Sequence, residues 1–239
     1  MKKLIIVRHG QSEWNAKNKF TGWVDSPLSA KGKLEAKKAG KLIKELNIPI
    51  TYTFTSFLIR AKNTLEIILN VLKKKNIHLT ESWELNERHY GYLTGLNKKE
   101  TELEIGEKLF KKYRRSWNIA PPRIRNDSIH LNSFSKLNYK IPLNKIPTTE
   151  SLQNTYNRVI PYFEKKIYPL IKKNECILLV AHGNSLRALC KNLFKINNNN
   201  INNLEIPTGN PLLISFNKKF IIEEARYLDS ERRKPILSI

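Results

Sequence analysis

The amino-acid sequence predicts an α/β fold, a three-layer sandwich in which a mixed, mainly parallel sheet is flanked by helices. Residues 4–7 and 176–181 are two wholly apolar runs, as expected for strands that are buried on both faces. Segments with apolar residues at helical spacing alternate with further strand-like runs along the chain. Because no linker-like segment divides it, we expect a single domain over residues 1–239.

The first half supplies two strand–helix pairs. We expect the first strand at 4–7 and an amphipathic helix at 29–46, with Ser29 as its N-cap and Pro49 beyond its end. A second strand follows at 51–55 and a second helix at 57–75. One or two polar helices are expected between residues 97 and 117, interrupted near Gly106.

The second half begins with a segment that has little periodicity. Residues 120–149 contain four prolines, so we interpret them as a long surface insertion. A helix at 151–172 must accommodate Pro161 and Pro169, and we expect Pro169 to mark its end. The remaining expected elements are a strand at 176–181, a helix at 184–194, and strands at 212–216 and 221–227.

The chain is strongly basic. Its 43 Lys and Arg residues outnumber 21 Asp and Glu residues, which gives a net charge of +22. This balance favours anionic substrates or a polyanionic partner. The lysines, however, are scattered over every predicted helix, whereas nucleic-acid binders concentrate them with aromatic residues. Since Lys, Asn and Ile share A/T-rich codons, codon bias is an alternative explanation of the charge, and we expect no nucleic-acid partner.

The composition also limits the cellular compartments in which we expect the protein. Two cysteines, Cys176 and Cys190, exclude a secreted scaffold held by several disulfides. The apolar run near the N-terminus stops at Arg8, too early for a signal peptide, and no stretch approaches the roughly 18–20 apolar residues that span a bilayer. We therefore expect a soluble, reduced, cytoplasmic protein with no membrane partner.

The same short pattern follows both apolar strands. His9-Gly10-Gln11-Ser12 follows the first, and His182-Gly183-Asn184-Ser185 follows the second. Ligands of open α/β sheets bind beyond the carboxyl ends of the strands. If these strands are neighbours, the two histidines face each other there. The glycines let backbone N–H groups approach an anion, and the second loop can begin a helix.

Two chemistries suit a pair of histidines in a basic pocket. Zinc would need a third ligand, and His78, His89 and His130 show no HxxxH-type spacing. Metal-free phosphoryl transfer fits better: one histidine attacks phosphorus while arginines neutralise the oxygens, with Arg8 and Arg60 as candidates. Glu87 is the best candidate for the general acid and base, because it lies in a polar, turn-like stretch.

Residues 8–15 (RHGQSEWN) resemble the RHGxSxxN signature of the histidine phosphatase superfamily. Within that superfamily the chain resembles the cofactor-dependent phosphoglycerate mutases, and the resemblance spans nearly the whole chain in order. The further segments that carry it are 20–25 (FTGWVD), 85–98 (LNERHYGYLTGLNK), 114–117 (RRSW), 147–152, 181–187 (AHGNSLR) and 206–209 (IPTG).

The resemblance implies a role for each matching residue. His9 would be the nucleophile that carries phosphate, His182 would stabilise the transferring group, and Glu87 would donate and accept the proton. Arg8 and Arg60 complete the implied catalytic set. The implied substrate-binding residues are Arg8, His9, Gly10, Gln11, Ser12, Glu13, Trp14, Asn15, Thr21, Gly22, Arg60, Glu87, Arg88, His89, Tyr90, Lys98, Arg114, Arg115, Gly183 and Asn184.

The resemblance also implies the reaction, an interconversion of 3-phosphoglycerate and 2-phosphoglycerate in glycolysis and gluconeogenesis. It would proceed through phosphohistidine, be primed by 2,3-bisphosphoglycerate and need no metal, in a homodimer. Two departures from the family pattern are a basic insertion at 123–149, whose one acid is Asp127, and a short tail after Tyr227. Both regions help cover the site in relatives, so a phosphatase acting on 2,3-bisphosphoglycerate or a related phosphoester is the alternative. A non-catalytic adaptor for RNA or acidic surfaces is disfavoured, because the motif residues are intact.

Overall fold

The fold is built on a six-stranded sheet with the order β3-β2-β4-β1-β5-β6. The computed structural model describes residues 2–74, 76–131, 141–173 and 175–236. The strands are β1 (Lys3–Arg8), β2 (Tyr52–Thr55), β3 (His78–Glu81), β4 (Cys176–Ala181), β5 (Leu212–Phe216) and β6 (Ile222–Tyr227). β3, β2, β4 and β1 run parallel, whereas β5 and β6 are antiparallel to their neighbours. The predicted mixed, mainly parallel sheet is confirmed.

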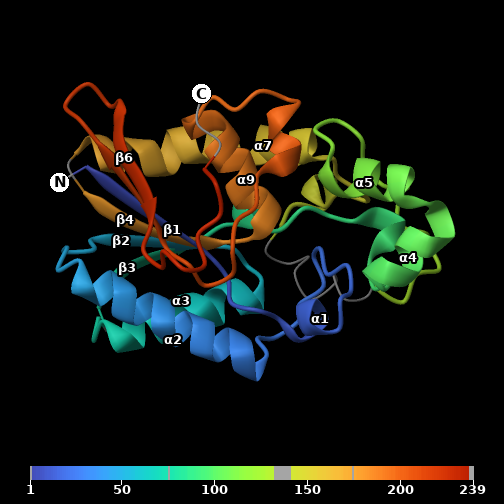
Figure 1. Ribbon diagram of the computed structural model, residues 1–239, viewed down its shortest axis with the longest axis horizontal. Helices are drawn as coiled ribbons and strands as arrows, with labels where there is room; N and C mark the ends of the chain where they lie inside the picture. Colours follow the sequence, from blue (N-terminus) through green and yellow to red (C-terminus); the bar gives the residue numbers. More distant parts are fainter. Residues whose placement is uncertain (1, 75, 132–140, 174, 237–239) are drawn as a thin grey trace.

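Helices cover both faces of this sheet (Figure 1). The helices α2 (Ala30–Glu45) and α3 (Ile59–Val71) lie on one face, and α7 (Leu152–Tyr162), α8 (Tyr168–Lys172) and α9 (Gly183–Leu193) lie on the other. This arrangement is the predicted three-layer sandwich.

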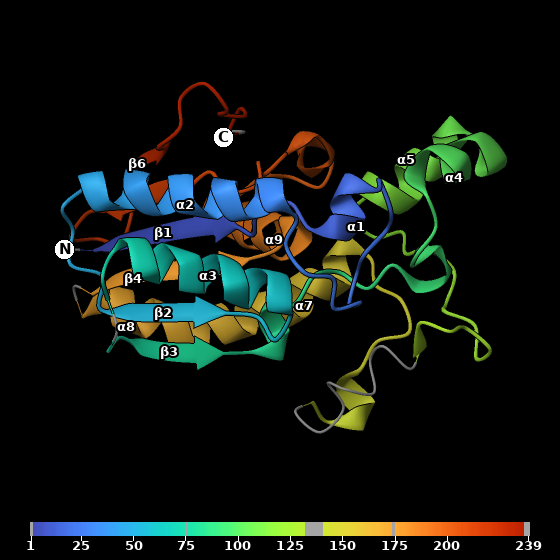
Figure 2. The same cartoon turned by 90° about the horizontal axis from the view of Figure 1, so that it is seen from below.

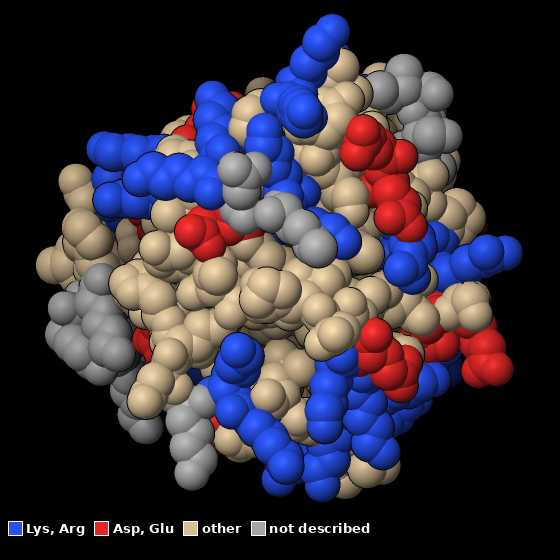
Figure 3. All heavy atoms as spheres, turned by 90° about the vertical axis from the view of Figure 1, so that its left-hand side faces the viewer, with Lys and Arg blue, Asp and Glu red and all other residues tan. Residues whose placement is uncertain are grey.

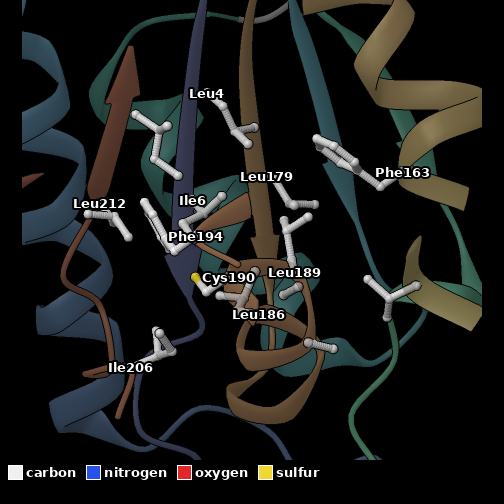
Figure 4. Close-up of a cluster of buried hydrophobic side chains, with 14 of the residues drawn as sticks. Leu4, Ile6, Phe163, Leu179, Leu186, Leu189, Cys190, Phe194, Ile206 and Leu212 are labelled. Atoms are coloured by element: carbon white, nitrogen blue, oxygen red, sulfur yellow. The ribbon is translucent and has the colours of Figure 1, made fainter. Parts of the chain in front are cut away.

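The alternation of side chains along β1 supplies both layers of the core. Ile5 and Val7 join the cluster under α2 and α3, while Leu4 and Ile6 join the cluster under α7 and α9. Figure 4 shows Leu4 and Ile6 on the same side of the sheet as Leu186, Leu189 and Cys190 of α9, with Ile6 the nearer to the helix. Because both faces are covered, the strand must be apolar throughout, which is why its sequence identifies it.

Several predicted helix ends are confirmed. The Ser29 side chain accepts a hydrogen bond from the Gly32 N–H and so caps α2. The polar region contains two helices, α4 (Lys98–Ile105) and α5 (Glu107–Arg115), which meet at Gly106 with φ of 80°. A left-handed φ costs glycine little, so the chain bends there between the two helices. The helix expected at 57–75 is shorter, because it begins at Ile59 and ends at Val71.

The expectation that Pro169 ends its helix is wrong. The chain continues as a π-helical turn (Phe163–Ile167) and then as α8, in which Pro169 lies in the first turn. Proline has no N–H for the usual ladder and its ring crowds the carbonyl four residues earlier. The wider π turn lies at that carbonyl, that of Lys165, and lets the helix pass the proline.

Two short elements have no counterpart among the predicted ones. β3 has four residues and lies at an edge of the sheet, and the helix α1 (Glu13–Ala16) also has four. Both lack an apolar pattern, because two residues of β3 are exposed and none is buried, and α1 has no buried residue.

The insertion at 120–149 is described except for residues 132–140. Ile124 and Ile141 are buried in a cluster with Trp23 and Leu58, so apolar contacts anchor both flanks of this segment. A 3₁₀ turn at Leu143–Lys145 lies within it. That residues 1–239 form a single domain stays a prediction.

The arrows of β1, β2 and β3 point toward the end of the molecule where α1, α4 and α5 lie (Figure 2). The carboxyl ends of the parallel strands therefore meet the segments in which the sequence motifs occur. Of the helices that the structure describes, none has the length and apolarity needed to span a membrane.

Candidate active site

A cavity lies beyond the carboxyl ends of β1 and β4, in two adjoining parts. The inner part, about 90 Å³, is lined by His9, Asn15, Arg60 and Lys98 among others. The outer part, about 210 Å³, is lined by residues that include Arg115, Gly183, Asn184 and Arg187. Four residues line both parts, which therefore adjoin, namely Arg8, Glu87, Tyr90 and Arg114.

Strand pairing brings the two histidines together. β1 and β4 are parallel neighbours with Arg8 opposite Ala181, so the next residues, His9 and His182, follow side by side. Their ring centroids are 4.9 Å apart, and both side chains are buried. Neighbouring strands were the condition for the predicted facing pair, and that condition is met.

His9 has the protonation state of a nucleophile. Its Nδ1 lies 2.6 Å from the Gly10 carbonyl oxygen, which can only accept, so Nδ1 carries the proton. The lone pair is thereby left on Nε2, which accepts a hydrogen bond from Arg60 Nε at 3.3 Å. Burial, helped by the charges of Arg60 and Arg8, lowers the pKa of His9 well below the usual 6.5. The ring is neutral at pH 7, with Nε2 available for attack.

His182 is held by different neighbours. Its Nε2 lies 2.6 Å from the Ser56 hydroxyl, which follows the end of β2. Burial is the main cause that lowers the pKa of His182 well below 6.5, followed by the charge of Arg60. His182 also precedes α9 directly as its N-cap residue. His182 itself lines neither part of the cavity, and its buried ring lies beside that of His9, which does line the inner part.

The N-terminus of α9 adds backbone donors to the site. Gly183 and Asn184 line the outer part of the cavity, and the Asn184 side-chain amide donates to the Tyr90 hydroxyl at 3.0 Å. The first N–H groups of a helix have no partner within it, and the helix dipole there favours an anion.

Rigid cations surround the inner part of the cavity. Arg60 is buried and donates to the carbonyl oxygens of Gly22 at 2.7 Å and Val24 at 2.9 Å, which fix its plane. Burial lowers the pKa of Arg60 from 12.5 to about 10, so it stays charged at pH 7. Arg8 donates to the Ile206 carbonyl oxygen at 2.8 Å, and Lys98 donates to that of Lys19 at 2.9 Å. These fixed positions suit the oxygens of a phosphoryl group.

Glu87 is the carboxylate of this site. It is only 7 % exposed and faces both parts of the cavity. One of its oxygens accepts from the backbone N–H groups of Arg88 at 2.8 Å and Asn184 at 3.0 Å. The carboxylate thus lies between the 85–98 segment and the start of α9, within the cavity that His9 also lines.

The sequence of the chain matches a known protein family. Residues 4–221 match the family model described as the histidine phosphatase superfamily, branch 1. The chain belongs to the histidine phosphatase superfamily. The expectation from residues 8–15 is therefore confirmed.

Within the superfamily, the chain is similar to proteins named 2,3-bisphosphoglycerate-dependent phosphoglycerate mutase. The one from Pelagibacter ubique is 52% identical over 99% of both chains, and the one from Caulobacter sp. (strain K31) is 44% identical over the full length of both. The resemblance to phosphoglycerate mutases is confirmed.

Solved structures support the histidine phosphatase fold. A mycobacterial glucosyl-3-phosphoglycerate phosphatase in complex with VO3 superposes with a TM-score of 0.66 at 20% identity, covering 95% of this chain and 97% of that one. YhfR of Bacillus stearothermophilus has a TM-score of 0.68 at 20% identity, covering 92% and 94%. At this identity the similarity concerns the fold alone.

Some residues with an implied binding role line neither the inner nor the outer part of the cavity. Ser12 caps α1, Gln11 accepts from the Ser29 hydroxyl at 2.9 Å, and Glu13 is exposed. The Trp14 ring contacts His130. Gly10 packs against Gly32, since a Cβ on Gly10 would lie 2.2 Å from the Gly32 carbonyl oxygen. A role of these residues in substrate binding stays a prediction.

Arg88 and His89 are buried beside the cavity without lining it. Arg88 donates to the Arg114 carbonyl oxygen at 3.1 Å and lies over the Tyr90 ring. The His89 Nδ1 accepts from the Gly91 N–H at 2.9 Å. Their binding roles also stay predictions, while Thr21 and Gly22 do line the inner part.

The structure adds residues that the sequence argument did not include. Arg187 lines the outer part and donates to Asn184 Oδ1 at 2.8 Å, Glu205 pairs with Arg115 at 2.6 Å, and Lys19 and Lys234 also line the cavity. Ser56 could have been found from the sequence, because it follows the predicted strand at 51–55 as His9 and His182 follow theirs. Over the described residues, no cluster of three or more His, Cys, Asp or Glu is placed to hold a metal ion.

Proposed function

We propose that this chain interconverts 3-phosphoglycerate and 2-phosphoglycerate, with His9 carrying the phosphoryl group. The observation that carries the proposal is the neutral His9 ring, with its Nε2 lone pair beside Arg60 in a cavity that Glu87 also lines. The identity of 42–52% to chains named as 2,3-bisphosphoglycerate-dependent phosphoglycerate mutases supports the same reaction.

In the first transfer, His9 Nε2 attacks phosphorus and the bond from phosphorus to the donor oxygen breaks. The Nδ1–H bond to the Gly10 carbonyl stabilises the ring as its positive charge develops. Arg8, Arg60 and the N-terminus of α9 stabilise the negative charge on the phosphoryl oxygens. Protonated Glu87 gives its proton to the departing oxygen, and in the reverse transfer its carboxylate takes one from the attacking hydroxyl.

The residues fit 2,3-bisphosphoglycerate as the priming donor. It supplies the phosphoryl group that first reaches the histidine, and its remaining anionic groups need further cations. Arg114 and Arg115 line the outer part of the cavity, and in the described residues the buried Nε groups of Arg8 and Arg187 have no hydrogen-bond partner. Buried donors of this kind are costly unless a ligand or water satisfies them. We propose that no metal takes part.

A coupled assay on the pure protein tests this function. It follows 2-phosphoglycerate formed from 3-phosphoglycerate in the presence of EDTA, with and without trace 2,3-bisphosphoglycerate. We expect turnover that survives EDTA and rises with the bisphosphate. Phosphate release from the bisphosphate without isomerisation would instead show the alternative, a phosphatase.

We also propose a cytoplasmic homodimer that binds neither membranes nor nucleic acid. On the face in Figure 3, Lys and Arg lie in separate groups around an uncharged centre with acidic residues among them, which does not form a single basic stripe. Light scattering should give a mass of twice 27.9 kDa. A mass of one chain would refute the dimer.

A further inference from the structure

Arg158 on α7 lies outside the cavity lining with its side chain only 8% exposed, and it contacts the turn that carries Glu87. Its Nη1 donates to the carbonyl oxygens of Glu84 at 2.7 Å and Asn86 at 3.0 Å, and its Nη2 donates to that of Glu87 at 2.9 Å. One guanidinium therefore holds three carbonyls of the segment 84–87. The Trp23 indole N–H donates to the same Glu87 carbonyl at 2.5 Å.

A carboxylate holds this guanidinium in place. Glu150 accepts from Arg158 Nε at 2.7 Å and from Nη2 at 3.0 Å, so the pair is bidentate. The side chains are only 8% and 5% exposed. Together these contacts use all five N–H donors of the arginine. A lysine has three donors on one atom and no planar fork, so it cannot reproduce this set.

Glu150 also holds the other side of Glu87. Its Oε2 accepts from the His89 N–H at 2.8 Å, and its own N–H donates to the His89 carbonyl oxygen at 2.9 Å. The Glu150–Arg158 pair therefore fixes the backbone before and after the Glu87–Arg88 dipeptide. Neither residue lines the cavity, so their effect on the reaction must pass through the segment that they hold.

We propose that Arg158 and Glu150 are positioning residues for proton transfer by Glu87. The inference rests on the proposed mutase function. Transfer to or from the substrate oxygen requires the carboxylate within hydrogen-bond reach, and a displacement of about 1 Å can cost about 100-fold in rate. The Glu150–Arg158 pair keeps the Glu87 backbone at a fixed position relative to His9, while the Glu87 carboxylate donates a proton in one transfer and accepts one in the next.

A double-mutant cycle tests this role. We expect Arg158→Lys to lower kcat about 10–100-fold and to change KM less than about threefold, since the residue does not touch substrate. Glu87→Gln should lower kcat about 10²–10⁴-fold. If Arg158 acts through Glu87, adding Arg158→Lys to Glu87→Gln should cost less than about threefold more. Multiplicative losses would overturn the proposal.

A matched control is Arg232→Lys. Arg232 likewise binds a carboxylate, that of Asp229 at 2.7 Å, and the carbonyl oxygens of Thr208 and Gly209, but it does not contact the Glu87 segment. Any loss it causes should multiply with that of Glu87→Gln. Wild-type turnover is measured in the same assay. Its absence would refute the proposed function rather than the positioning role of Arg158 and Glu150.

A second variant covers the case in which Arg158→Lys fails to fold. Glu150→Gln keeps the size of the side chain and one acceptor oxygen, but it removes the charge that orients Arg158. The same cycle with Glu87→Gln should again be non-additive. A folded Glu150→Gln enzyme with wild-type kcat would overturn the proposal as firmly as multiplicative losses.

Discussion

The two His-Gly loops have the same sequence pattern, lie at the ends of adjacent strands and differ in everything that surrounds them. In the first, the Gly10 carbonyl holds His9 Nδ1 and leaves Nε2 toward Arg60. In the second, the Ser56 hydroxyl contacts His182 Nε2 instead. These ring contacts support the proposal that His9 is the nucleophile and that His182 has a supporting role.

The elements that follow the loops differ as well. The first loop packs closely against the start of α2 and leads into the four-residue α1. The second loop opens the eleven-residue α9, whose N-terminus faces the cavity. The N-terminal dipole of α9 favours an anion at the cavity, and its Asn184 N–H already donates to Glu87, whereas the four-residue α1 begins outside the cavity lining. Two similar motifs, which differ at Gln11 and Asn184, thus have different surroundings because different elements follow them.

The largest contrast is expected between His9→Asn and His182→Asn. Without the nucleophile, His9→Asn should form no phosphoenzyme and have no mutase activity. His182→Asn keeps His9 Nε2 and loses only stabilisation of the transferring group, so phosphoenzyme formation should slow about 10²–10³-fold. Incorporation of radiolabelled phosphate from 2,3-bisphosphoglycerate measures both. Label retained on His9→Asn would reverse the assignment.

A second contrast concerns the two glycines and the stability of the fold. A Cβ on Gly10 would lie 2.2 Å from the Gly32 carbonyl oxygen, whereas the nearest atoms to a Cβ on Gly183 are those of Arg8 at 3.4 Å. Gly10→Ala should lower the free energy of unfolding by about 3 kcal/mol, and Gly183→Ala by less than about 1 kcal/mol. Urea denaturation compares them, and equal losses would show that the first loop is not tightly packed.

Ser56→Ala sharpens the comparison without removing either histidine. Loss of the contact between Ser56 and His182 should slow phosphoenzyme formation about 2–10-fold, the range for one neutral hydrogen bond. Stopped-flow quenching measures this rate, and the exposed variant Ser230→Ala is the control. An unchanged rate in Ser56→Ala would mean that the hydroxyl does not orient the ring.

The smallest effect is expected from pH. Burial lowers the pKa of both His9 and His182 well below 6.5, so neither ring gains a proton between pH 7 and pH 6. The rate of phosphoenzyme formation should change less than about 1.5-fold over that range, whereas an imidazole with the ordinary pKa would lose about threefold. A threefold fall would contradict the neutral, buried pair.

The same pKa shifts determine whether the free energy of unfolding rises or falls with pH. Below about pH 6.5 the unfolded chain takes up protons on these histidines before the folded chain does. The stability due to the neutral rings is therefore present above that pH and is lost as the pH falls through the folded values. When the urea midpoint is plotted against pH, it should therefore fall on the acid side, and His9→Asn should make that fall smaller.

Local sequence determined the strands and helices that are long enough to show a pattern. β1 and β4 are recognisable because burial on both faces excludes polar residues. Ser29 identifies a helix start through its side-chain hydroxyl, and Gly106 identifies a helix end through its positive φ. The repeated His-Gly pattern located one end of the sheet as the site, because parallel strands that share a sheet bring their carboxyl ends together.

Only the tertiary structure decided what holds those groups. Arg158 is one of 43 basic residues in the sequence, and its contacts with Glu84, Asn86 and Glu87 lie 71–74 residues away. Ser56 meets His182 across 126 residues, and β3 is a strand because β2 lies beside it. Periodicity and spacing describe neighbours along the chain, whereas burial, charge pairing and protonation depend on neighbours in space. For that reason the sequence could propose His9 as the nucleophile, but only the fold shows what lowers the pKa of its ring and which residues contact the segment of Glu87.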